Sequence, residues 1–302
     1  MKEFIKKVDK SGSTKPAKVL LVNEETELMK FLLAQLPDKN RNNIKSLLKH
    51  KQVLVDDKMI SQFNHMLKPG QKVMFVSDRI ATAKQFRGIS IVFEDQYLIV
   101  IDKHAGMLSV AKDNEQNETA YSILSRHVKT FNPNNKIFVV HRLDRDTSGL
   151  MMFAKSQQIQ KLLQEDWNND IKERTYVALT EGQVEKEEGA ITSYLYESKA
   201  LIMYSSQNPE KGEEAITHYR VIRRNTQYSL LIVNLETGKK NQIRVHMQDI
   251  GHSIVGDKKY GSTSNPIGRL GLHACLLAFK HPVTQEPLRF ETKIPGKFLQ
   301  LF

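Results

Sequence analysis

The chain has 302 residues, enough for two domains, and its hydrophobic fraction of 40% and charged fraction of 26% are typical of a globular protein with a buried core. Its formal net charge of +11 favours a polyanionic partner, because basic side chains attract phosphates and release their counterions; general solubility is the alternative explanation. The single cysteine, Cys275, excludes an internal disulfide and the common zinc spacings. The N-terminal residues lack the apolar core of a secretory signal, and no run approaches the roughly 18 apolar residues of a membrane helix. We therefore expect a cytoplasmic protein without membrane contact.

The N-terminal part is predicted to be a flexible tail, residues 1–17, followed by a small α+β domain, residues 18–78. Apolar residues recur at helical spacing in residues 24–36, and a second helix is expected over residues 41–50. One face of the second helix carries Arg41, Lys45 and Lys49 at i, i+4 and i+8. Two short strands, residues 52–55 and 72–76, complete the predicted unit.

A polar segment, residues 79–88, is predicted to link this unit to a larger domain, residues 89–302. Helices are expected there at residues 119–129 and 157–167. Strands are expected at residues 89–93, 97–102, 137–140, 150–154, 175–180, 229–235, 242–247 and 272–279. Strands outnumber helices and do not alternate regularly with them. The pattern therefore favours an α+β domain with a mixed or antiparallel sheet over a doubly wound one.

The sharpest chemical signal is the segment from His141 to Leu150, His-Arg-Leu-Asp-Arg-Asp-Thr-Ser-Gly-Leu, which lies between two predicted strands. Reactive side chains collect in loops that a rigid sheet holds in place. A simple turn explains the composition of residues 146–149, but it does not explain His141, Arg142 and Asp144.

Polar residues Gln242, Arg244 and His246 alternate with apolar ones, which predicts a strand with a polar face. An arginine on such a face can hold a carboxylate through two contacts, although an ordinary exposed face explains the pattern as well. Tyr176, in another predicted strand, is by itself typical of a core tyrosine. The basic, glycine-flanked loop of residues 256–261 is by itself typical of a solvated turn.

Taken together, these segments resemble the RluA-type RNA pseudouridine synthases. The similarity covers nearly all of residues 89–302, with the motifs in the family's order, and the motif around Asp144 is the most specific. The other matching segments are Glu94-Asp95 with Leu98-Ile99-Val100, Arg174-Thr175-Tyr176 with Ala178-Leu179, Gln242-Ile243-Arg244-Val245-His246, Gly251-His252, Gly256-Asp257, Tyr260-Gly261, and Leu272-His273-Ala274 with Phe279, His281 and Pro282.

The resemblance implies an enzyme that converts uridine to pseudouridine in ribosomal or transfer RNA. The isomerisation consumes nothing, so no cofactor or metal is expected, and no obligatory protein partner is evident from the sequence. The resemblance makes Asp144 the catalytic carboxylate and Arg244 its partner. Tyr176 is expected to stack on the uracil, and Arg142 to fill the space that the flipped base leaves.

The family's motif places the catalytic carboxylate directly after His-Arg-Leu, which assigns Asp146 to the turn and His141 to support of the loop. Two departures bear on local loop shape and RNA preference. Residues 103–106 are Lys-His-Ala-Gly where the family usually has Lys-Pro-Ala-Gly, and Lys240-Asn241 stands where Thr-His is common.

Residues 18–78 resemble, less closely, an S-four-like RNA-binding domain, named after a ribosomal protein of the small subunit. That resemblance would place RNA phosphates on Arg41, Lys45 and Lys49. One rival hypothesis is an RNA-binding protein with an inactive synthase-like domain, which the intact catalytic set disfavours. Another is a metal-dependent hydrolase, but no His-Glu-x-x-His or similar ligand spacing occurs.

Overall fold

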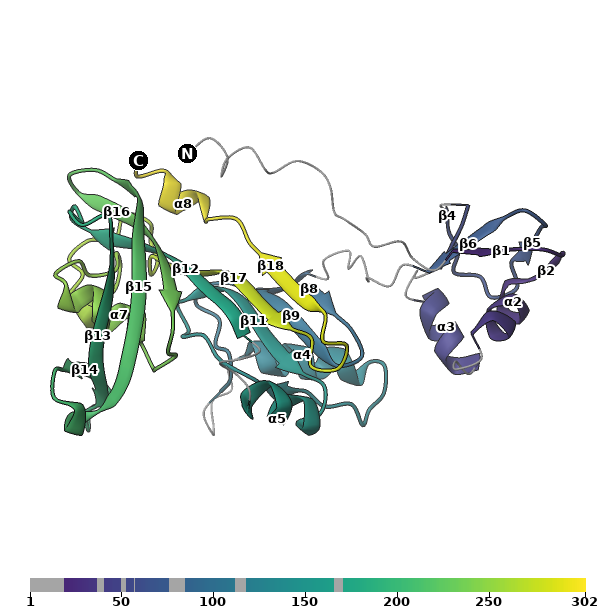
Figure 1. The fold of residues 1–302 in the computed structure, drawn as a ribbon, viewed down its shortest axis with the longest axis horizontal. Coiled ribbons are helices and arrows are strands. Elements are labelled where there is room, and N and C mark those ends of the chain that lie inside the picture. Colours follow the sequence, from purple (N-terminus) through teal and green to yellow (C-terminus); the bar gives the residue numbers. More distant parts are fainter. Residues whose placement is uncertain are drawn as a thin grey trace. The chain divides into compact units, whose positions relative to one another are not determined.

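The computed structural model describes residues 19–36, 41–49, 53–56, 58–75, 85–111, 118–165 and 171–302 (Figure 1). The chain divides into two units, Met1–Thr82 and Ala83–Phe302, each with its own hydrophobic core. The predicted tail, residues 1–17, lies outside the described residues. No helix among the described residues is long and apolar enough to span a bilayer.

The first unit packs two helices, α2 (Leu28–Gln35) and α3 (Arg41–Lys49), against short antiparallel strands. Four strands follow the order β1-β6-β3-β4, and β2 pairs with β5. Leu28 and Leu32 of α2 and Ile44 and Leu48 of α3 are buried, so each helix forms because its apolar stripe faces one core. Both predicted helices are confirmed. The strands are β1 (Val19–Leu21), β2 (Thr26–Glu27), β3 (Val53–Val55), β4 (Lys58–Met59), β5 (Met66–Leu67) and β6 (Lys72–Phe75).

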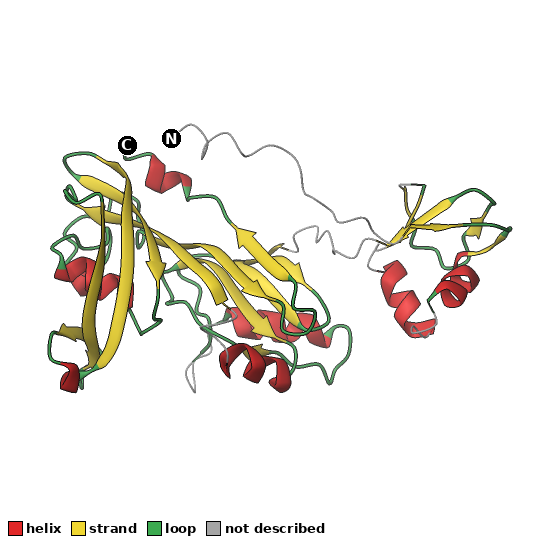
Figure 2. Ribbon diagram, in the orientation of Figure 1, coloured by secondary structure: helices red, strands yellow, loops and turns green. Residues whose placement is uncertain are grey.

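The second unit is built on a twelve-stranded mixed sheet, which confirms the predicted α+β class (Figure 2). The order along it is β14-β13-β15-β16-β12-β17-β11-β9-β8-β7, with β10 paired to β11 and β18 to β17. Among these named strands, β11 and β17 form the parallel pair. The strands are β7 (Gln85–Phe86), β8 (Ile89–Glu94), β9 (Leu98–Lys103), β10 (Phe138–Val139), β11 (Ser148–Ala154), β12 (Ile171–Glu181), β13 (Glu188–Glu197), β14 (Met203–Ser206), β15 (Glu213–Arg224), β16 (Tyr228–Leu235), β17 (Leu272–Lys280) and β18 (Pro287–Glu291).

Successive residues of β9 contribute to two different cores, as strand geometry requires. Ile99 and Ile101 join a core that includes α4 (Ala120–Lys129), whereas Leu98 and Val100 join one that includes α5 (Gln157–Glu165). Both helices were predicted. The remaining helical elements are α7 (Gln242–Asp249), α8 (Gly296–Leu299) and the short 3₁₀ turns η1 (Pro209–Lys211) and η2 (Lys258–Tyr260).

The parallel contact between β11 and β17 fixes the position of the loop that precedes β11. Gly149 lies opposite Ala274 with φ of +115°, and a Cβ atom there would lie 2.1 Å from the Ala274 carbonyl oxygen. The close approach and the positive φ both require glycine. The loop of residues 141–147 therefore emerges from the middle of the sheet rather than from its edge.

Residues 242–247 were predicted as a strand, and this prediction is wrong: they lie in the helix α7. Gln242 and His246, one helical turn apart, are both buried and both bond the Thr217 hydroxyl, at 2.9 and 2.8 Å. Ile243 also packs into the core. The polar residues alternate with apolar ones because two of them are buried hydrogen-bonding groups, not because they share an exposed face.

The predicted linker of residues 79–88 extends too far toward the C-terminus. Its last residues form β7, which pairs with β8, and Phe86 packs against the core beneath α4. Residues 79–84 lie outside the described part of the chain.

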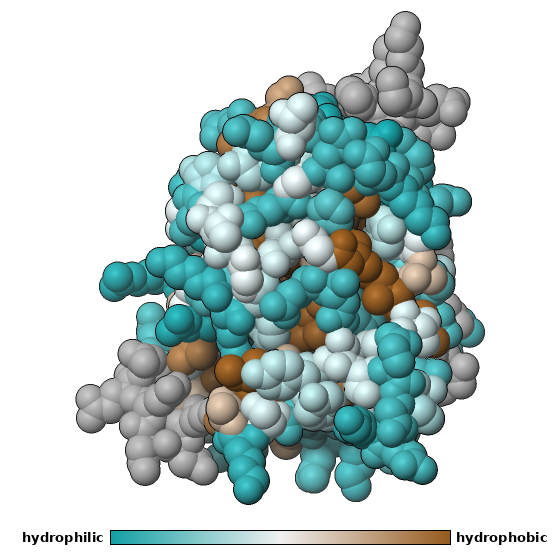
Figure 3. Space-filling model, turned by 90° about the vertical axis from the view of Figure 1, so that its left-hand side faces the viewer, coloured by the Kyte–Doolittle hydropathy of each residue, from teal (hydrophilic) through white to brown (hydrophobic). Residues whose placement is uncertain are grey.

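In the first unit the short strands β1, β2, β4 and β5 were not predicted. In the second unit the strands β13, β14, β15 and β18 were missed. Their hydrophobic residues are sparse because much of each strand is exposed and polar, as the alternating burial of β15 shows. Figure 3 views the side of the molecule that carries β13–β16, where hydrophilic residues and residues of intermediate hydropathy surround a hydrophobic patch near the middle.

Candidate active site

The loop before β11 is fixed through its backbone on both sides of Asp144. On one side, the Ser109 hydroxyl donates to the Leu143 carbonyl oxygen at 2.6 Å and accepts from the Leu143 amide at 3.2 Å. On the other, the Arg145 carbonyl oxygen accepts from the Gly106 amide at 2.9 Å and from Lys103 Nζ at 3.0 Å. The Asp144 side chain therefore projects from a rigid frame.

Lys103 is a fully buried lysine below this loop. Its ammonium group also donates to the Met107 carbonyl oxygen at 2.8 Å and to that of His104 at 3.2 Å. Burial lowers the pKa of Lys103 to about 8, although Asp146 and Asp144 favour the charged form. The group is still mostly protonated at neutral pH, so it places a buried positive charge under the loop.

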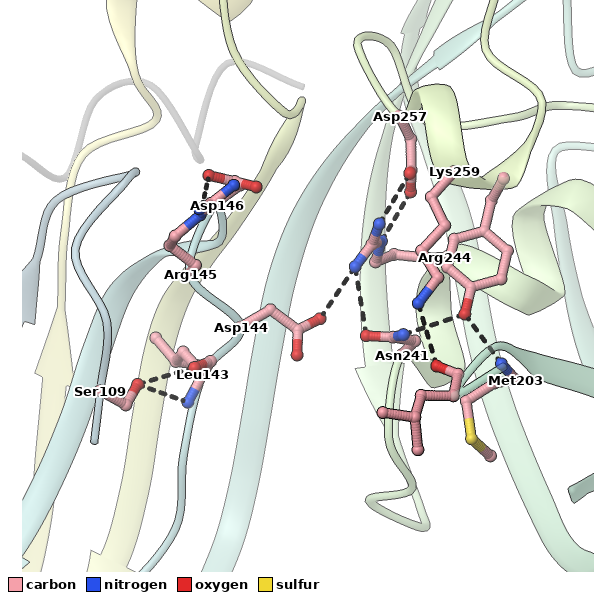
Figure 4. A network of polar contacts seen from close by, with 12 residues as sticks. Ser109, Leu143, Asp144, Arg145, Asp146, Met203, Asn241, Arg244, Asp257 and Lys259 are labelled. Carbon is pink, nitrogen blue, oxygen red and sulfur yellow. Dashed lines mark hydrogen bonds and ion pairs between the residues drawn. The ribbon is translucent and has the colours of Figure 1, made fainter. Parts of the chain in front are cut away.

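Asp144 faces Arg244 from the opposite side of a cleft (Figure 4). The two side chains come from the loop before β11 and from α7, and Arg244 Nη1 lies 3.4 Å from Asp144 Oδ2. The Asp144 side chain is 32% exposed and that of Arg244 14%. The carboxylate is thus open to a substrate, while the guanidinium is held beneath the surface.

The sequence suggested that the guanidinium of Arg244 would hold Asp144 through two contacts. In the structure, Arg244 makes its two-contact pair with Asp257 instead. Nε and Nη2 donate to the two carboxylate oxygens of Asp257 at 2.6 and 2.7 Å. The Asp257 side chain is 1% exposed. Burial opposes the charge on Arg244, but Asp257 and then Asp144 raise its pKa above the ordinary value. Arg244 is therefore a permanently charged group whose spare nitrogen points at Asp144.

Asn241 supports that spare nitrogen. Its Oδ1 accepts from Arg244 Nη1 at 3.1 Å, and its Nδ2 donates to the Tyr260 hydroxyl at 2.9 Å. Tyr260 in turn lies under the guanidinium, with its ring centre 4.8 Å from the guanidinium carbon. Sequence reasoning missed Asp257, Asn241 and Tyr260 as contributors to the site. The signals were present as the matching Gly256-Asp257 and Tyr260-Gly261 pairs and the departure at Lys240-Asn241.

Tyr176 of β12 packs against two hydrophobic cores where they meet at the floor of the cleft. Burial raises the pKa of Tyr176 to about 12, so the phenol keeps its proton at neutral pH. The structure thus brings Tyr176, Asp144 and Arg244 to one cavity.

That cavity, called here the first pocket, has a volume of about 890 Å³. Its walls carry six basic side chains and three acidic ones, which suits a polyanion. The charged residues are Arg142, Asp144, Arg145, Asp146, Glu197, Lys239, Lys240, Arg244 and Lys259. Arg142 lies exposed in this wall. No group of three or more His, Cys, Asp or Glu side chains gathers around a possible metal position in the described part of the chain.

Two neighbours of Asp144 in the motif have other surroundings. Burial lowers the pKa of His141 to about 3, and its Nε2 accepts from the Met152 amide at 3.1 Å, which fits a structural role. Asp146 is 52% exposed and pairs with Arg145 at 3.4 Å.

The predicted RNA-binding residues Arg41, Lys45 and Lys49 belong to α3 of the first unit, whereas residues of the second unit line this cavity. Arg41 and Lys45 are exposed on α3, and the side chain of Lys49 lies outside the described residues. Nothing in the geometry of α3 by itself identifies a ligand.

Comparison with known proteins agrees with this geometry. The family model described as RNA pseudouridylate synthase matches residues 97–249. The chain is 30% identical to an uncharacterized RNA pseudouridine synthase of Bacillus subtilis, YhcT, over 85% of this chain and 86% of the relative. It is also 30% identical to the ribosomal large subunit pseudouridine synthase D of Neisseria meningitidis, over 88% of this chain and 75% of the relative. The human structure of RNA Pseudouridylate Synthase Domain Containing 4, at 22% identity, has the same fold with a TM-score of 0.57, over 70% of this chain and 90% of that one. The chain therefore belongs to the RluA-type RNA pseudouridine synthases, which are isomerases that act on RNA.

Proposed function

We propose that Asp144 is the carboxylate with which this enzyme isomerises uridine, and that the reaction needs no cofactor. The observation that carries the proposal is the pairing across the first pocket. Asp144 is the carboxylate whose backbone is fixed on both sides and whose side chain meets the spare nitrogen of Arg244. The backbone on both sides of Asp146 is hydrogen-bonded as well, but the Asp146 side chain pairs with the exposed Arg145 and not with Arg244.

The chemistry asks for one carboxylate beside the sugar. The glycosidic bond from the ribose to uracil N1 breaks, the uracil turns, and a new bond forms from the anomeric carbon to uracil C5. The C5 proton is lost and N1 ends protonated, so atoms and electrons balance without a second reactant. The sugar passes through an oxocarbenium-like state, which an anionic carboxylate stabilises. Asp144 serves equally by attacking the anomeric carbon or by removing a ribose proton, since both roles require the anion.

The other residues of the first pocket have roles that follow from their surroundings. Arg244 orients and balances the charge of Asp144. Tyr176 is a protonated, partly buried ring on which the detached uracil stacks. Arg142 is exposed at the wall and fills the gap in the RNA stack after the uridine flips.

Ribosomal RNA is the first candidate substrate, because the Neisseria meningitidis relative is named for the large ribosomal subunit; transfer RNA is the alternative. We further propose that the first unit is an S-four-like module that binds RNA through the exposed face of α3. Cytoplasmic location stays a prediction.

The test begins by mapping pseudouridines in total RNA from cells with and without the gene, which identifies a target uridine. Single-turnover conversion of an RNA with that uridine is then measured for Asp144→Asn and Asp146→Asn. We expect Asp144→Asn to lose on the order of a thousandfold or more, because the near-isosteric amide cannot act as the anion. Asp146→Asn should keep conversion within about tenfold, since it loses only an exposed ion pair.

Melting temperature and RNA affinity serve as controls, and both should change little in either variant. Fast conversion by Asp144→Asn together with an inactive Asp146→Asn would reverse the assignment. Loss in both variants with intact folding would mean that the loop, not one carboxylate, carries the activity.

A further inference from the structure

A second pocket, of about 490 Å³, lies beside the first. The two share Arg145, Asp146, Arg244 and Lys259, so a ligand in the first pocket meets the second directly. The rest of its wall comes from the loop before α4, from η2 and from the loops that flank it: Ala105, Gly106, Gly256, Asp257, Lys258, Gly268, Arg269 and Leu270. Of the residues found only in this second wall, Asp257 has a role in the reaction as argued above, because it holds Arg244; the others have none.

The charges of the second pocket do not cancel. Five basic side chains face two carboxylates, and each carboxylate already has a cation of its own. Asp257 is held by Arg244 at 2.6 and 2.7 Å, and Asp146 by Arg145 at 3.4 Å. An excess of three positive charges remains on Lys258, Lys259 and Arg269.

A buried cation adds to this field from below. Lys103 is fully buried and donates to the Arg145 carbonyl oxygen at 3.0 Å, directly beneath the shared wall. Asp146, Asp144 and Asp102 favour the charged form of Lys103, so this cation offsets carboxylates near the pocket that would otherwise oppose its basic side chains.

Two of the three excess cations are already occupied. Arg269 donates to the Ser148 hydroxyl at 2.7 Å and to the carbonyl oxygens of Leu272 and Leu270 at 3.1 and 3.0 Å. Lys259 donates to the Leu201 carbonyl oxygen at 3.1 Å. Lys258 is exposed and makes no hydrogen bond or ion pair with a described residue. It is the cation available to a ligand.

We propose that the second pocket binds the phosphodiester backbone of the RNA next to the target uridine, with Lys258 as its main phosphate contact. The inference rests on the proposed function, because the first pocket must hold the uridine for the second to hold its neighbouring linkage. A phosphate of the RNA strand that enters the first pocket carries the negative charge that would balance the basic side chains of the second pocket. Such a contact positions the nucleotide without reading its base.

The first experiment measures the affinity of the full chain for the mapped target RNA as a function of potassium chloride concentration. Lys258→Gln should lower affinity several-fold at low salt and reduce the slope of log affinity against log salt by roughly 0.7–0.9. Lys258→Arg should keep the wild-type slope. The matched control is Lys161→Gln, an exposed lysine of α5 that lines neither pocket.

The second experiment locates the contact. RNAs with one neutral methylphosphonate linkage, on either side of the target uridine, are bound to the wild type and to Lys258→Gln. One of these linkages should weaken wild-type binding and cause no further loss in Lys258→Gln, because both changes remove the same contact.

The proposal is wrong if the affinity losses from the neutral linkage and from Lys258→Gln multiply. It is also wrong if Lys258→Gln and Lys161→Gln change the salt slope equally. Both readouts are binding constants, so they judge the pocket whether or not the RNA is converted. Conversion of the same RNA by the wild type judges the proposed function separately.

Discussion

Arg244 is shared between two carboxylates with different environments. Asp257 is buried and takes the fork, whereas Asp144 is partly open and receives one nitrogen at 3.4 Å. A planar guanidinium can satisfy both at once, because its nitrogens point in fixed, divergent directions. Asn241 Oδ1 accepts a hydrogen bond at 3.1 Å from the same nitrogen, Nη1, that meets Asp144. The orientation of the catalytic carboxylate thus depends on residues that never meet the substrate.

Asp257→Asn should therefore slow single-turnover conversion by roughly ten- to a hundredfold, because a shift of about 1 Å in a catalytic group has effects of that size. Arg244→Lys should be affected more, since an ammonium cannot contact Asp257 through two nitrogens and reach Asp144 as well. RNA affinity should change much less in both variants. The quantity measured is the conversion rate at saturating enzyme.

The matched control for that measurement is Asp249→Asn. Asp249 is an exposed carboxylate at the end of α7, the helix that also carries Arg244, and it accepts a hydrogen bond from the Ser205 hydroxyl at 2.7 Å. Melting temperatures separate misorientation from unfolding, because breaking a buried ion pair also destabilises a protein. If Asp257→Asn converts RNA as fast as Asp249→Asn, the buried pair does not position Arg244.

At the scale of elements, the two-residue strand β7 decides where the second unit begins. Phe86 packs against the core beneath α4, and its ring lies edge-on to His127 at 5.6 Å between centres. A chain cut at Gly88 loses this contact, whereas a chain cut at Ala83 keeps it. Both should fold, since the second unit has its own core.

We expect the chain that begins at Ala83 to melt several degrees above the chain that begins at Gly88. Burial of part of a phenylalanine is worth about 1–2 kcal/mol, and each kcal/mol shifts the melting temperature of a domain of this size by about 2–4 °C. Thermal unfolding followed by near-ultraviolet circular dichroism is the measurement. Phe86→Ala in the longer chain should reproduce most of the difference. Equal melting temperatures for the two chains would mean that β7 does not stabilise the second unit and belongs to the linker.

At the scale of the whole molecule, the net charge of +11 is spread over both units, and the first pocket alone carries an excess of three positive charges in its wall. The proposed RNA contacts of the first unit are the exposed Arg41 and Lys45 of α3, together with Lys49 from the same helix. Such contacts add affinity that is independent of the catalytic step.

Changing Arg41, Lys45 and Lys49 together to Ala should flatten the salt dependence of RNA binding by roughly one unit per lost phosphate contact. Single-turnover conversion at saturating enzyme should stay near the wild-type rate. The matched control changes Lys129, Lys161 and Lys186, which are exposed in the second unit and line neither pocket. An unchanged slope in the α3 variant would mean that this helix does not bind RNA.

The sequence alone determined those parts of the protein whose signal is local. The apolar runs of β9, β11, β12 and β17 predicted strands because fully buried strands need apolar residues on both faces. The helices α4 and α5 followed from their apolar stripes. The motif around Asp144 identified the family. Its residues are contiguous and lie in one loop, so the motif can be recognised without knowing any tertiary contact.

Only the tertiary structure decided how distant residues pair. Nothing local separates Asp144 from Asp257 as the partner of the Arg244 fork, because both are aspartates in polar loops. The fold buries one of them, and a buried carboxylate must find a cation, whereas an open one does not have to. Burial also decided that Gln242 and His246 face Thr217 inside a short helix, where their alternation with apolar residues had suggested a strand. The sequence shows which residues are polar. Tertiary packing determines which of these polar residues are buried and which partner each one bonds.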